Sequence, residues 1–497
     1  MAGLWAESGP AASAPVLASF LKSAAGLARK AGWADRLELA RVIHSLGTAL
    51  RAGRLFRRAS WTAFRRRFLS SITPAERAGL EACGLLPPAD FRAWARALRE
   101  SAFDTVGRTI VFGGRRRLSH PRNCLRSDEI VWGRASARLD LGGGWTDTPP
   151  YSLECGGCVI NAAVTLNGQP PIQVYARVTS RLDIRINSID HGADLRIREL
   201  DELLDYKDPA SRFGLAKAAL ALSGFSPAHA RWPAGVRTLS AMLDRFGGGL
   251  ELTTLAAIPS GSGLGTSSIM GAVLAAVISR MTGRALAPDE LFNRVLQLEQ
   301  ELTTGGGWQD QIGGVLPGVK MITTKAGLVP DPLVHYVPAD LLDPGRNGGT
   351  TLLYYTGLRR LAKNILRSVV GRYLDRDKAT VETLRRLHAF PPQMVDAMSR
   401  KDHRRFGELI DVAWNLNKRI DPDSTTPEIE AVLGRIRRHI WGAKLLGAGG
   451  GGFLLVVCKS AGDAAAVRRL LSVRPPNPRA RFFDYEVDDR GLTVTVC

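Results

Sequence analysis

The sequence predicts an α+β protein, in which helices and strands mix without the regular alternation of a doubly wound sheet. Residues 1–125 have the apolar spacing of helices and few glycine-rich turns. From Ile130 onward, short strand-like runs alternate with glycine turns, and helical runs stand between them. Because strands and helices do not recur as βαβ units, an α+β arrangement is favoured over a parallel α/β sheet.

The composition is that of a soluble globular protein. With 497 residues, of which 45% are hydrophobic and 23% charged, the chain is long enough for about two or three domains. No apolar run approaches the length of a membrane span, and the N-terminus lacks the pattern of a secretory signal. The 6 cysteines are scattered, as in proteins of a reducing compartment. We therefore expect a cytoplasmic protein with no membrane partner.

The net charge of +20 raises the question of nucleic-acid binding. Much of the excess lies in one basic stretch, which comprises Arg51, Arg54, Arg57, Arg58, Arg65, Arg66 and Arg67. With Trp61 and Phe64 interleaved, this stretch could bind a phosphate backbone. Since no nucleic-acid-binding motif accompanies it, a solvated helix face is favoured and no nucleic-acid partner is expected.

Residues 1–125 are expected to form a helical N-terminal extension, or to be the remnant of a linker. One apolar face is predicted from residues at helical spacing: Leu39, Val42, Ile43, Leu46 and Leu50. Thr73-Pro74-Ala75-Glu76 has a cap, a first-turn proline and a carboxylate at the third position, which together predict a helix start. Asp90 is expected to cap a further helix that begins at Phe91.

Beyond the extension, strands and helices are expected in two domains, 126–340 and 341–497. Ile172–Val178 and Leu182–Ile186 alternate apolar and polar residues, as half-buried antiparallel strands do. Proline and glycine are dense over Pro338–Thr350, which predicts the boundary. The other expected strands are Leu250–Ile258, Thr351–Tyr355 and Gly452–Cys458, and the other helices are Ile269–Met281, one from Pro288, Leu358–Tyr373 and Pro427–Trp441.

The residues from Pro259 to Ser268, here called the phosphate cradle, separate a predicted strand from a predicted helix. Three glycines at alternate positions allow positive φ angles and the close approach of a ligand, and the helix start offers free N–H groups to an anion. No Gly-Lys-Ser/Thr follows, so this is not the common P-loop. The alternative is a plain glycine-rich turn. The residues expected to bind phosphate are Pro259, Gly261, Ser262, Gly263, Leu264, Gly265, Thr266, Ser267 and Ser268.

Three further segments carry potential chemistry. In Arg138-Leu-Asp-Leu-Gly-Gly-Gly-Trp-Thr-Asp147, an arginine and two aspartates flank a turn, and carboxylates suit the recognition of hydroxyl groups. Glycines precede Asp310, which follows Glu299 and could equally be a helix cap. Leu446–Phe453 has glycine at five of six successive positions, which implies a close backbone or ligand, or else a flexible turn.

These segments together resemble the small-molecule kinase superfamily named for galactose, homoserine, mevalonate and phosphomevalonate (GHMP kinases). Arg138 and Asp147 stand where its first motif has an arginine and a Thr-Asp pair. The phosphate cradle is similar to its second motif, Pro-x-x-x-Gly-Leu-Gly-Ser-Ser, with Thr266 in place of the first serine. Leu446–Phe453 is similar to its third motif, and the likeness covers roughly Ile130 to Cys458.

The resemblance implies ATP and Mg²⁺ as cofactors and a two-lobed fold, ribosomal-S5-like over 126–340 and ferredoxin-like over 341–497. Asp310 and Arg138 would be catalytic, and Glu299 and Asp310 have the spacing at which mevalonate-kinase-like members carry a magnesium ligand and the catalytic aspartate. Ser267 and Glu299 would hold the metal. The residues assigned to the sugar are Asp147, Asp140, Gly449 and Gly450.

Within the superfamily, Leu141–Tyr151 and Glu154–Asn161 are similar to the kinase half of bacterial and plant L-fucokinase/GDP-fucose pyrophosphorylases. Gly305–Gly314, Trp414–Arg419 and Asp421 also match that branch. The implied reaction is phosphorylation of the anomeric hydroxyl of L-fucose. Residues 1–125 are too few for a nucleotidyltransferase domain, so the second activity is expected to be absent.

Other interpretations stay open at this point. Heptose-phosphate kinases share a Gly-Gly-x-x-Asp-x-Pro pattern but lack Trp-Thr-Asp-Thr-Pro-Pro-Tyr, and D-arabinose or L-galactose are further candidate substrates. A catalytically silent sugar-sensing regulator is a non-enzyme alternative, disfavoured because Arg138, Glu299 and Asp310 are all present. Cys155 and Cys158 have neither a second cysteine pair nor a nearby histidine, which disfavours zinc. The oligomeric state is not indicated.

Overall fold

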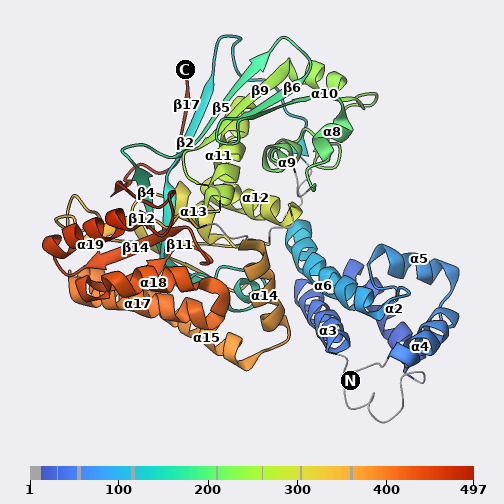
Figure 1. Ribbon diagram of the computed structural model, residues 1–497. Helices are drawn as coiled ribbons and strands as arrows, with labels where there is room; N and C mark the ends of the chain where they lie inside the picture. Colours follow the sequence, from blue (N-terminus) through green and yellow to red (C-terminus); the bar gives the residue numbers. More distant parts are fainter. Residues whose placement is uncertain are drawn as a thin grey trace. The chain divides into compact units, whose positions relative to one another are not determined.

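The computed structural model describes residues 13–30, 32–52, 58–113, 118–208, 211–259, 261–302, 305–358 and 362–497 (Figure 1). The chain forms two compact units: Met1–Gly113 with Val370–Asp377, and Gly114–Val369 with Lys378–Cys497. The boundaries expected at residues 125 and 340 stay predictions. No helix in these described ranges is long and apolar enough to cross a membrane.

The smaller unit is helical, as predicted. Its helices are α2 (Ala14–Lys30), α3 (Trp33–Arg51), α4 (Arg58–Ser70), α5 (Pro74–Ala82) and α6 (Phe91–Gly113). Both predicted helix starts are confirmed, because Glu76 N donates to Thr73 Oγ1 at 3.3 Å and Arg92 N donates to Asp90 Oδ1 at 3.1 Å. These side chains satisfy backbone donors that the first helical turn leaves unpaired.

The aromatic residues of the basic stretch belong to the core of this unit. Trp61 and Phe64 are buried and stack with ring centroids 5.4 Å apart, and Trp94 packs against both. They therefore present no face on which a nucleic-acid base could stack. Arg54 and Arg57 of the basic stretch lie outside the described residues.

The larger unit contains a six-stranded sheet on which α11 (Thr266–Met281) packs (Figure 1). Its strands, in spatial order, are β17 (Thr493–Val496), β2 (Val131–Ala135), β5 (Ile172–Thr179), β9 (Gly249–Ala256), β6 (Ile184–Ser188) and β7 (Ala193–Ile197). The prediction of antiparallel strands holds for β5 but only partly for β6, which is antiparallel to β7 and parallel to β9. The alternation of apolar and polar side chains indicates which face of a strand is buried. It cannot distinguish parallel from antiparallel pairing.

A second sheet carries the first motif. Its strands are β11 (Leu333–Val337), β10 (Val319–Thr324), β4 (Gly157–Leu166) and β16 (Tyr485–Val487), and β3 (Ala137–Gly142) pairs with β4. The remaining elements around these two sheets are β1 (Leu118–Ser119), α7 (Tyr151–Cys155), α8 (Leu200–Leu204), α9 (Gly214–Leu222), β8 (Ala230–Arg231), α10 (Leu239–Phe246), α12 (Pro288–Glu301) and α13 (Gln309–Val315).

The third sheet has the topology of a ferredoxin-like fold. Its spatial order is β13 (Ile440–Leu445), β14 (Phe453–Cys458), β12 (Thr351–Tyr355) and β15 (Arg481–Phe483), all antiparallel. Helices follow the first and third of these strands along the chain, which gives β-α-β-β-α-β. The helices are α14 (Ala362–Leu374), α15 (Lys378–Ala389), α16 (Pro391–Ser399), α17 (His403–Ile420), α18 (Pro427–Ile436) and α19 (Ala461–Val473).

One predicted helix was too long. The run Pro427–Trp441 is helical only to Ile436, and Trp441 belongs to β13. The 3₁₀ turn Arg437–His439 lies between α18 and β13, and β13 pairs with β14 with a register shift at Trp441. Pairing with β14, the next strand along the chain, thus overrides the helical pattern of the local sequence.

Candidate active site

The phosphate cradle has the backbone that its glycines predict. Gly261, Gly263 and Gly265 have φ angles of 70°, 84° and 75°, which non-glycine residues rarely adopt. Helix α11 begins at Thr266, so its free N–H groups face the turn. The hydroxyls of Ser262 and Thr266 are buried and find no hydrogen-bond partner in the part of the chain that the structure describes. Unpaired donors at a helix start suit a phosphate group. Ser260 lies outside the described residues.

The glycines of Leu446–Phe453 permit close contact between two backbones. A Cβ on Gly263 would lie 2.2 Å from the carbonyl oxygen of Leu446, and one on Gly452 would lie 2.2 Å from that of Ser262. Phe453 N also donates to Ser262 O at 3.1 Å. The predicted close approach is therefore confirmed, with the cradle as the neighbouring backbone.

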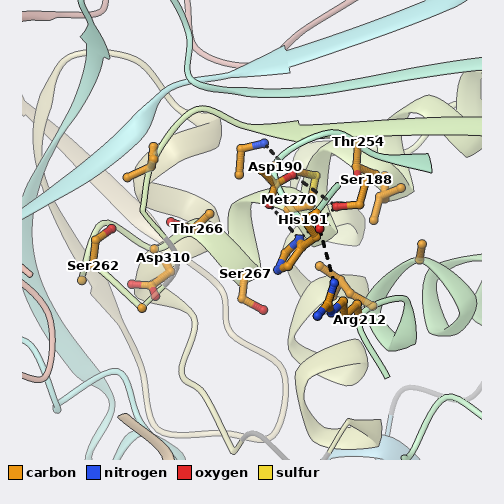
Figure 2. Close-up of a pocket in the computed structure, with 18 of the residues that line it drawn as sticks. Ser188, Asp190, His191, Arg212, Thr254, Ser262, Thr266, Ser267, Met270 and Asp310 are labelled. Carbon is orange, nitrogen blue, oxygen red and sulfur yellow. Dashed lines mark hydrogen bonds and ion pairs between the residues drawn. The ribbon is translucent and has the colours of Figure 1, made fainter. Parts of the chain in front are cut away.

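Two cavities adjoin the cradle, both within the larger unit. The first, here called the cradle cavity, has a volume of about 360 Å³ and extends from the cradle toward β6, β9 and α9. Figure 2 shows Ser262, Thr266 and Asp310 at one end and Ser188, His191 and Arg212 at the other, with Ser267 between them. Phe213, Leu215 and Met270 supply apolar wall.

The second cavity, here called the carboxylate cavity, has a volume of about 320 Å³. Its walls include Arg138, Asp140 and Asp147 from the first motif, and Glu299. Gly263, Gly265, Ser267 and Asp310 line both cavities. A ligand held by the cradle and a ligand in the carboxylate cavity would thus meet at Asp310.

Asp310 and Arg138, predicted as the catalytic pair, form an ion pair between α13 and β3. The Arg138 side chain is 4% exposed and that of Asp310 33% exposed, so the carboxylate still faces the cavities. Burial lowers the pKa of Arg138, while Asp140 and Asp147 act in the opposite direction. A Cβ on Gly265 would lie 3.2 Å from Asp310 Cγ, so the carboxylate is directly beside the cradle.

Asp147 is a buried carboxylate with one backbone donor. Gln309 N donates to Asp147 Oδ2 at 3.2 Å, and a Cβ on Gly307 would lie 2.1 Å from the same oxygen. Burial raises the pKa of Asp147 to about 6, against which the Gln309 hydrogen bond and the Arg138 charge act. A carboxylate in a cavity with acceptor capacity left can bind the hydroxyl groups of a ligand.

Asp140 is engaged by the protein itself. Lys444 Nζ donates to Asp140 Oδ2 at 2.5 Å and Gln309 Nε2 donates to Oδ1 at 3.1 Å. Burial acts to raise the pKa of Asp140, but the charges of Lys444 and Arg138 outweigh it and hold the pKa below its usual value. These bonds favour a positioning role for Asp140 over the direct sugar contact that was expected.

Sequence reasoning missed Lys444 and Gln309. Lys444 is a buried lysine in the apolar strand β13, directly before the third glycine segment, and that placement was the available signal. Gln309 precedes Asp310, and its backbone and side chain bond Asp147 and Asp140.

The predicted metal ligands are Ser267 and Glu299, and the structure pairs Glu299 with the next serine. Ser268 Oγ donates to Glu299 Oε1 at 2.7 Å, while Ser267 lines both cavities. The described residues contain no group of three or more His, Cys, Asp or Glu that could hold a metal ion. Mg²⁺ commonly uses one or two carboxylates with phosphate oxygens and water, so hydroxyl and carboxylate oxygens beside a phosphate site fit this ion.

The glycines assigned to the sugar lie elsewhere. Gly449 lines the cradle cavity, and Gly450 N donates to Ser424 O at 2.5 Å. Neither is among the described residues that line the carboxylate cavity. Gly449 therefore faces the cradle cavity, and Gly450 is not among the described residues that line either cavity.

Comparisons with known proteins found two matching families and several relatives. The GHMP kinases N terminal domain family matches residues 235–318, and the GHMP kinases C terminal family matches residues 394–472. The L-fucokinase/L-fucose-1-P guanylyltransferase of Bacteroides fragilis is 43% identical over 80% of this chain and 42% of its own length. The bifunctional fucokinase/GDP-fucose pyrophosphorylase of Arabidopsis thaliana is 34% identical over 67% of this chain and 30% of its own length.

The chain therefore spans less than half the length of these two relatives. Among solved structures, the Lactococcus lactis galactokinase complexed with galactose has a TM-score of 0.54 at 18% identity, covering 74% of this chain and 95% of its own. A mevalonate kinase has a TM-score of 0.52 at 16% identity, covering 72% and 99%. These two likenesses concern the fold.

Proposed function

This chain belongs to the GHMP kinase family, and from that membership we propose that it is an ATP-dependent L-fucokinase. The proposed reaction joins the anomeric oxygen of the sugar to the γ-phosphorus of ATP. The bond from that phosphorus to the β,γ-bridging oxygen breaks, and the products are fucose 1-phosphate and ADP. The observation that carries the proposal is Asp310, which is paired with Arg138 and lines both cavities.

In this reaction the cradle holds the β- and γ-phosphates through the N-terminus of α11 and the hydroxyls of Ser262 and Thr266. The apolar part of the cradle cavity, which includes Phe213 and Met270, receives the nucleoside. Glu299 and Ser267 would hold Mg²⁺, which would supply neutralisation of the phosphate charge.

Asp310 accepts the proton of the anomeric hydroxyl in the proposed mechanism. Arg138 keeps Asp310 ionised and stabilises the negative charge that develops on the transferred group. Phosphoryl transfer requires positioning and charge neutralisation more than covalent help, and this pair supplies both.

The walls of the carboxylate cavity favour a neutral sugar as the substrate. Asp147 is the carboxylate that has acceptor capacity left for sugar hydroxyls. Along the cavity walls that the structure describes, Arg138 is the one basic side chain, and it is paired with Asp310. Among the described wall residues, a second phosphate or a carboxylate on the substrate would find no cation other than Arg138, which disfavours heptose phosphates. The six cysteines are free, which supports a reducing compartment such as the cytoplasm.

The test is a panel of sugars with ATP, scored by ADP release: L-fucose, L-galactose, D-arabinose and a heptose 7-phosphate. L-Fucose is expected to give the highest kcat/KM. Asp310→Asn is expected to lower kcat by about 100- to 10,000-fold, because it removes the proton acceptor. The matched control is Asp489→Asn at an exposed carboxylate, which should keep full activity.

Three outcomes would contradict parts of the proposal. Full activity of the Asp310→Asn protein would refute the assigned mechanism. Activity on the heptose phosphate alone would replace the substrate and keep the kinase. Sugar binding without any ADP release would instead support a sugar-sensing regulator.

A further inference from the structure

Trp145 has a backbone conformation that its bulk disfavours. Its φ angle is 79°, in the left-handed region that large side chains rarely adopt. Glycine would occupy this position without strain, and Gly143 and Gly144 stand directly before it. A bulky residue held in a strained conformation therefore indicates a role for its side chain.

Among the described residues, neither ring stacking nor a side-chain hydrogen bond supplies that role. Trp145 is half-buried, and no described residue stacks a ring on its indole or accepts a hydrogen bond from its Nε1. Trp308, by contrast, is fully buried in a core cluster with Val159 and Ile312. Trp61 and Trp94 likewise pack in an aromatic core. Trp145 is thus unlike the core tryptophans, and it lines the carboxylate cavity.

The walls of this cavity differ in chemistry. Asp147, two residues beyond Trp145, accepts hydrogen bonds. Trp145, Leu366 and Ala448 contribute apolar surface. A sugar has a matching division, because its hydroxyls point outward while C–H groups can gather on one ring face. Aromatic rings bind such C–H faces, and the amphipathic indole is the largest of them.

We propose that Trp145 determines the sugar specificity of this site, its indole packing against the C–H face of a neutral 6-deoxy sugar. This inference rests on the proposed sugar-kinase function and extends it to the substrate class. In L-fucose the C–H groups at positions 3, 4 and 5 share one face, beside the methyl group. In L-galactose, C6 carries a hydroxyl group where L-fucose has the methyl group. An apolar wall cannot replace the hydrogen bonds that this hydroxyl makes to water.

Three substitutions separate binding from structure: Trp145→Phe, Trp145→Ala and Trp145→Gly. The Ala and Gly variants are expected to raise the KM for L-fucose about tenfold or more, and to reduce the L-fucose to L-galactose ratio of kcat/KM by a similar factor. Trp145→Phe should keep the KM within about threefold, because an aromatic face remains. The KM for ATP should not change in any of them.

The thermal stability of the Trp145 variants should not follow their loss of sugar binding. The Gly variant is expected to have a Tm no lower than wild type, and higher than the Ala variant, because only glycine relieves the strained φ. Lys401→Gly is the matched control, since Lys401 has a φ of 56° and an exposed side chain outside both cavities. It should leave the KM for L-fucose unchanged.

Two results would overturn the inference while the kinase stands. One is an unchanged sugar KM and an unchanged sugar ratio in the Ala and Gly variants. The other is a loss of Tm in both variants together with an equal loss of kcat for every sugar, as a structural tryptophan would give. If wild type released no ADP with any sugar, the proposed function would fail. Tryptophan fluorescence then decides the inference separately: L-fucose should change the emission of wild type and not of Trp145→Phe, and equal responses would refute it.

Discussion

Asp147, which is proposed to bind the sugar, is expected to destabilise the folded protein at neutral pH because its carboxylate is buried. Its carboxylate has few donors around it, and burial raises its pKa to about 6. Between its usual value and about pH 6, the folded state binds more protons at this group than the unfolded state does. The contribution of Asp147 to stability therefore falls as pH rises through that window, and at pH 7 the cost of a buried charge is fully present.

Asp147→Asn is accordingly expected to stabilise the protein at pH 7 by about 1–3 kcal/mol, because the amide is neutral and can still accept from Gln309 N. The gain over wild type should shrink toward pH 4. The same variant should lower the kcat/KM for L-fucose by about 100-fold, because hydroxyl groups bond a carboxylate more strongly than an amide. Urea unfolding at pH 7 and pH 4, together with sugar kinetics, measures both effects.

The kinetic counterpart is a fall in wild-type kcat/KM below about pH 6, as Asp147 becomes protonated. The exposed Asp489 again provides the control, since Asp489→Asn should change neither the stability difference nor the kinetics. A destabilised Asp147→Asn protein at pH 7 would contradict the assigned cost of burial.

At the scale of elements, helix α13 is held at both ends. Its first turn carries Asp310, and near its last turn Lys320 Nζ donates to Gly313 O at 2.9 Å. Lys320 also donates to Gly318 O at 3.2 Å and is completely buried. A cation near a helix C-terminus is favourable, yet burial lowers the pKa of Lys320 to about 7, while Asp488 acts against that shift.

Lys320→Met is expected to change how stability depends on pH. Between about pH 7 and the usual lysine value, the unfolded state binds more protons at Lys320 than the folded state, so wild-type stability gains with rising pH. The gain is at most about 1.4 kcal/mol per pH unit and should be absent in the variant. Urea unfolding from pH 7 to pH 8.5 tests this, with the exposed Lys325→Met as control. Parallel curves for wild type and Lys320→Met would refute the prediction.

The contact between the cradle and the third glycine segment gives a prediction about backbones. Gly263→Ala would place a Cβ 2.2 Å from Leu446 O at a φ of 84°, so we expect a loss of about 2–5 kcal/mol and of ATP binding. Gly434→Ala is the matched control, since that glycine lies in α18 with open space around it. It should instead stabilise the protein by about 0.5–1 kcal/mol. Thermal unfolding and ATP titration measure both, and equal stability of the two variants would contradict the packing argument.

At the scale of the whole molecule, folding brings together residues that lie far apart along the chain. Arg138 and Asp310 are 172 residues apart, and Asp140 and Lys444 are 304 apart, yet both pairs are in contact. The second pair joins β3 of one sheet to β13 of another. The carboxylate cavity thus draws its walls from segments that share no local sequence.

Several structural features of this protein could be predicted from its sequence, because they depend on residues that are close together along the chain. Left-handed glycines before a helix start, the Thr73 and Asp90 caps and the strand Thr351–Tyr355 depend on neighbouring residues, and all are confirmed. The order of the motifs identified the kinase family, which the comparisons confirm.

Other features depend on contacts that only folding creates. The tertiary structure ended the Pro427 helix at Ile436, paired Glu299 with Ser268, and engaged Asp140 with Lys444. Hydrogen bonds and ion pairs between distant segments require a geometry that residue types and spacing do not encode.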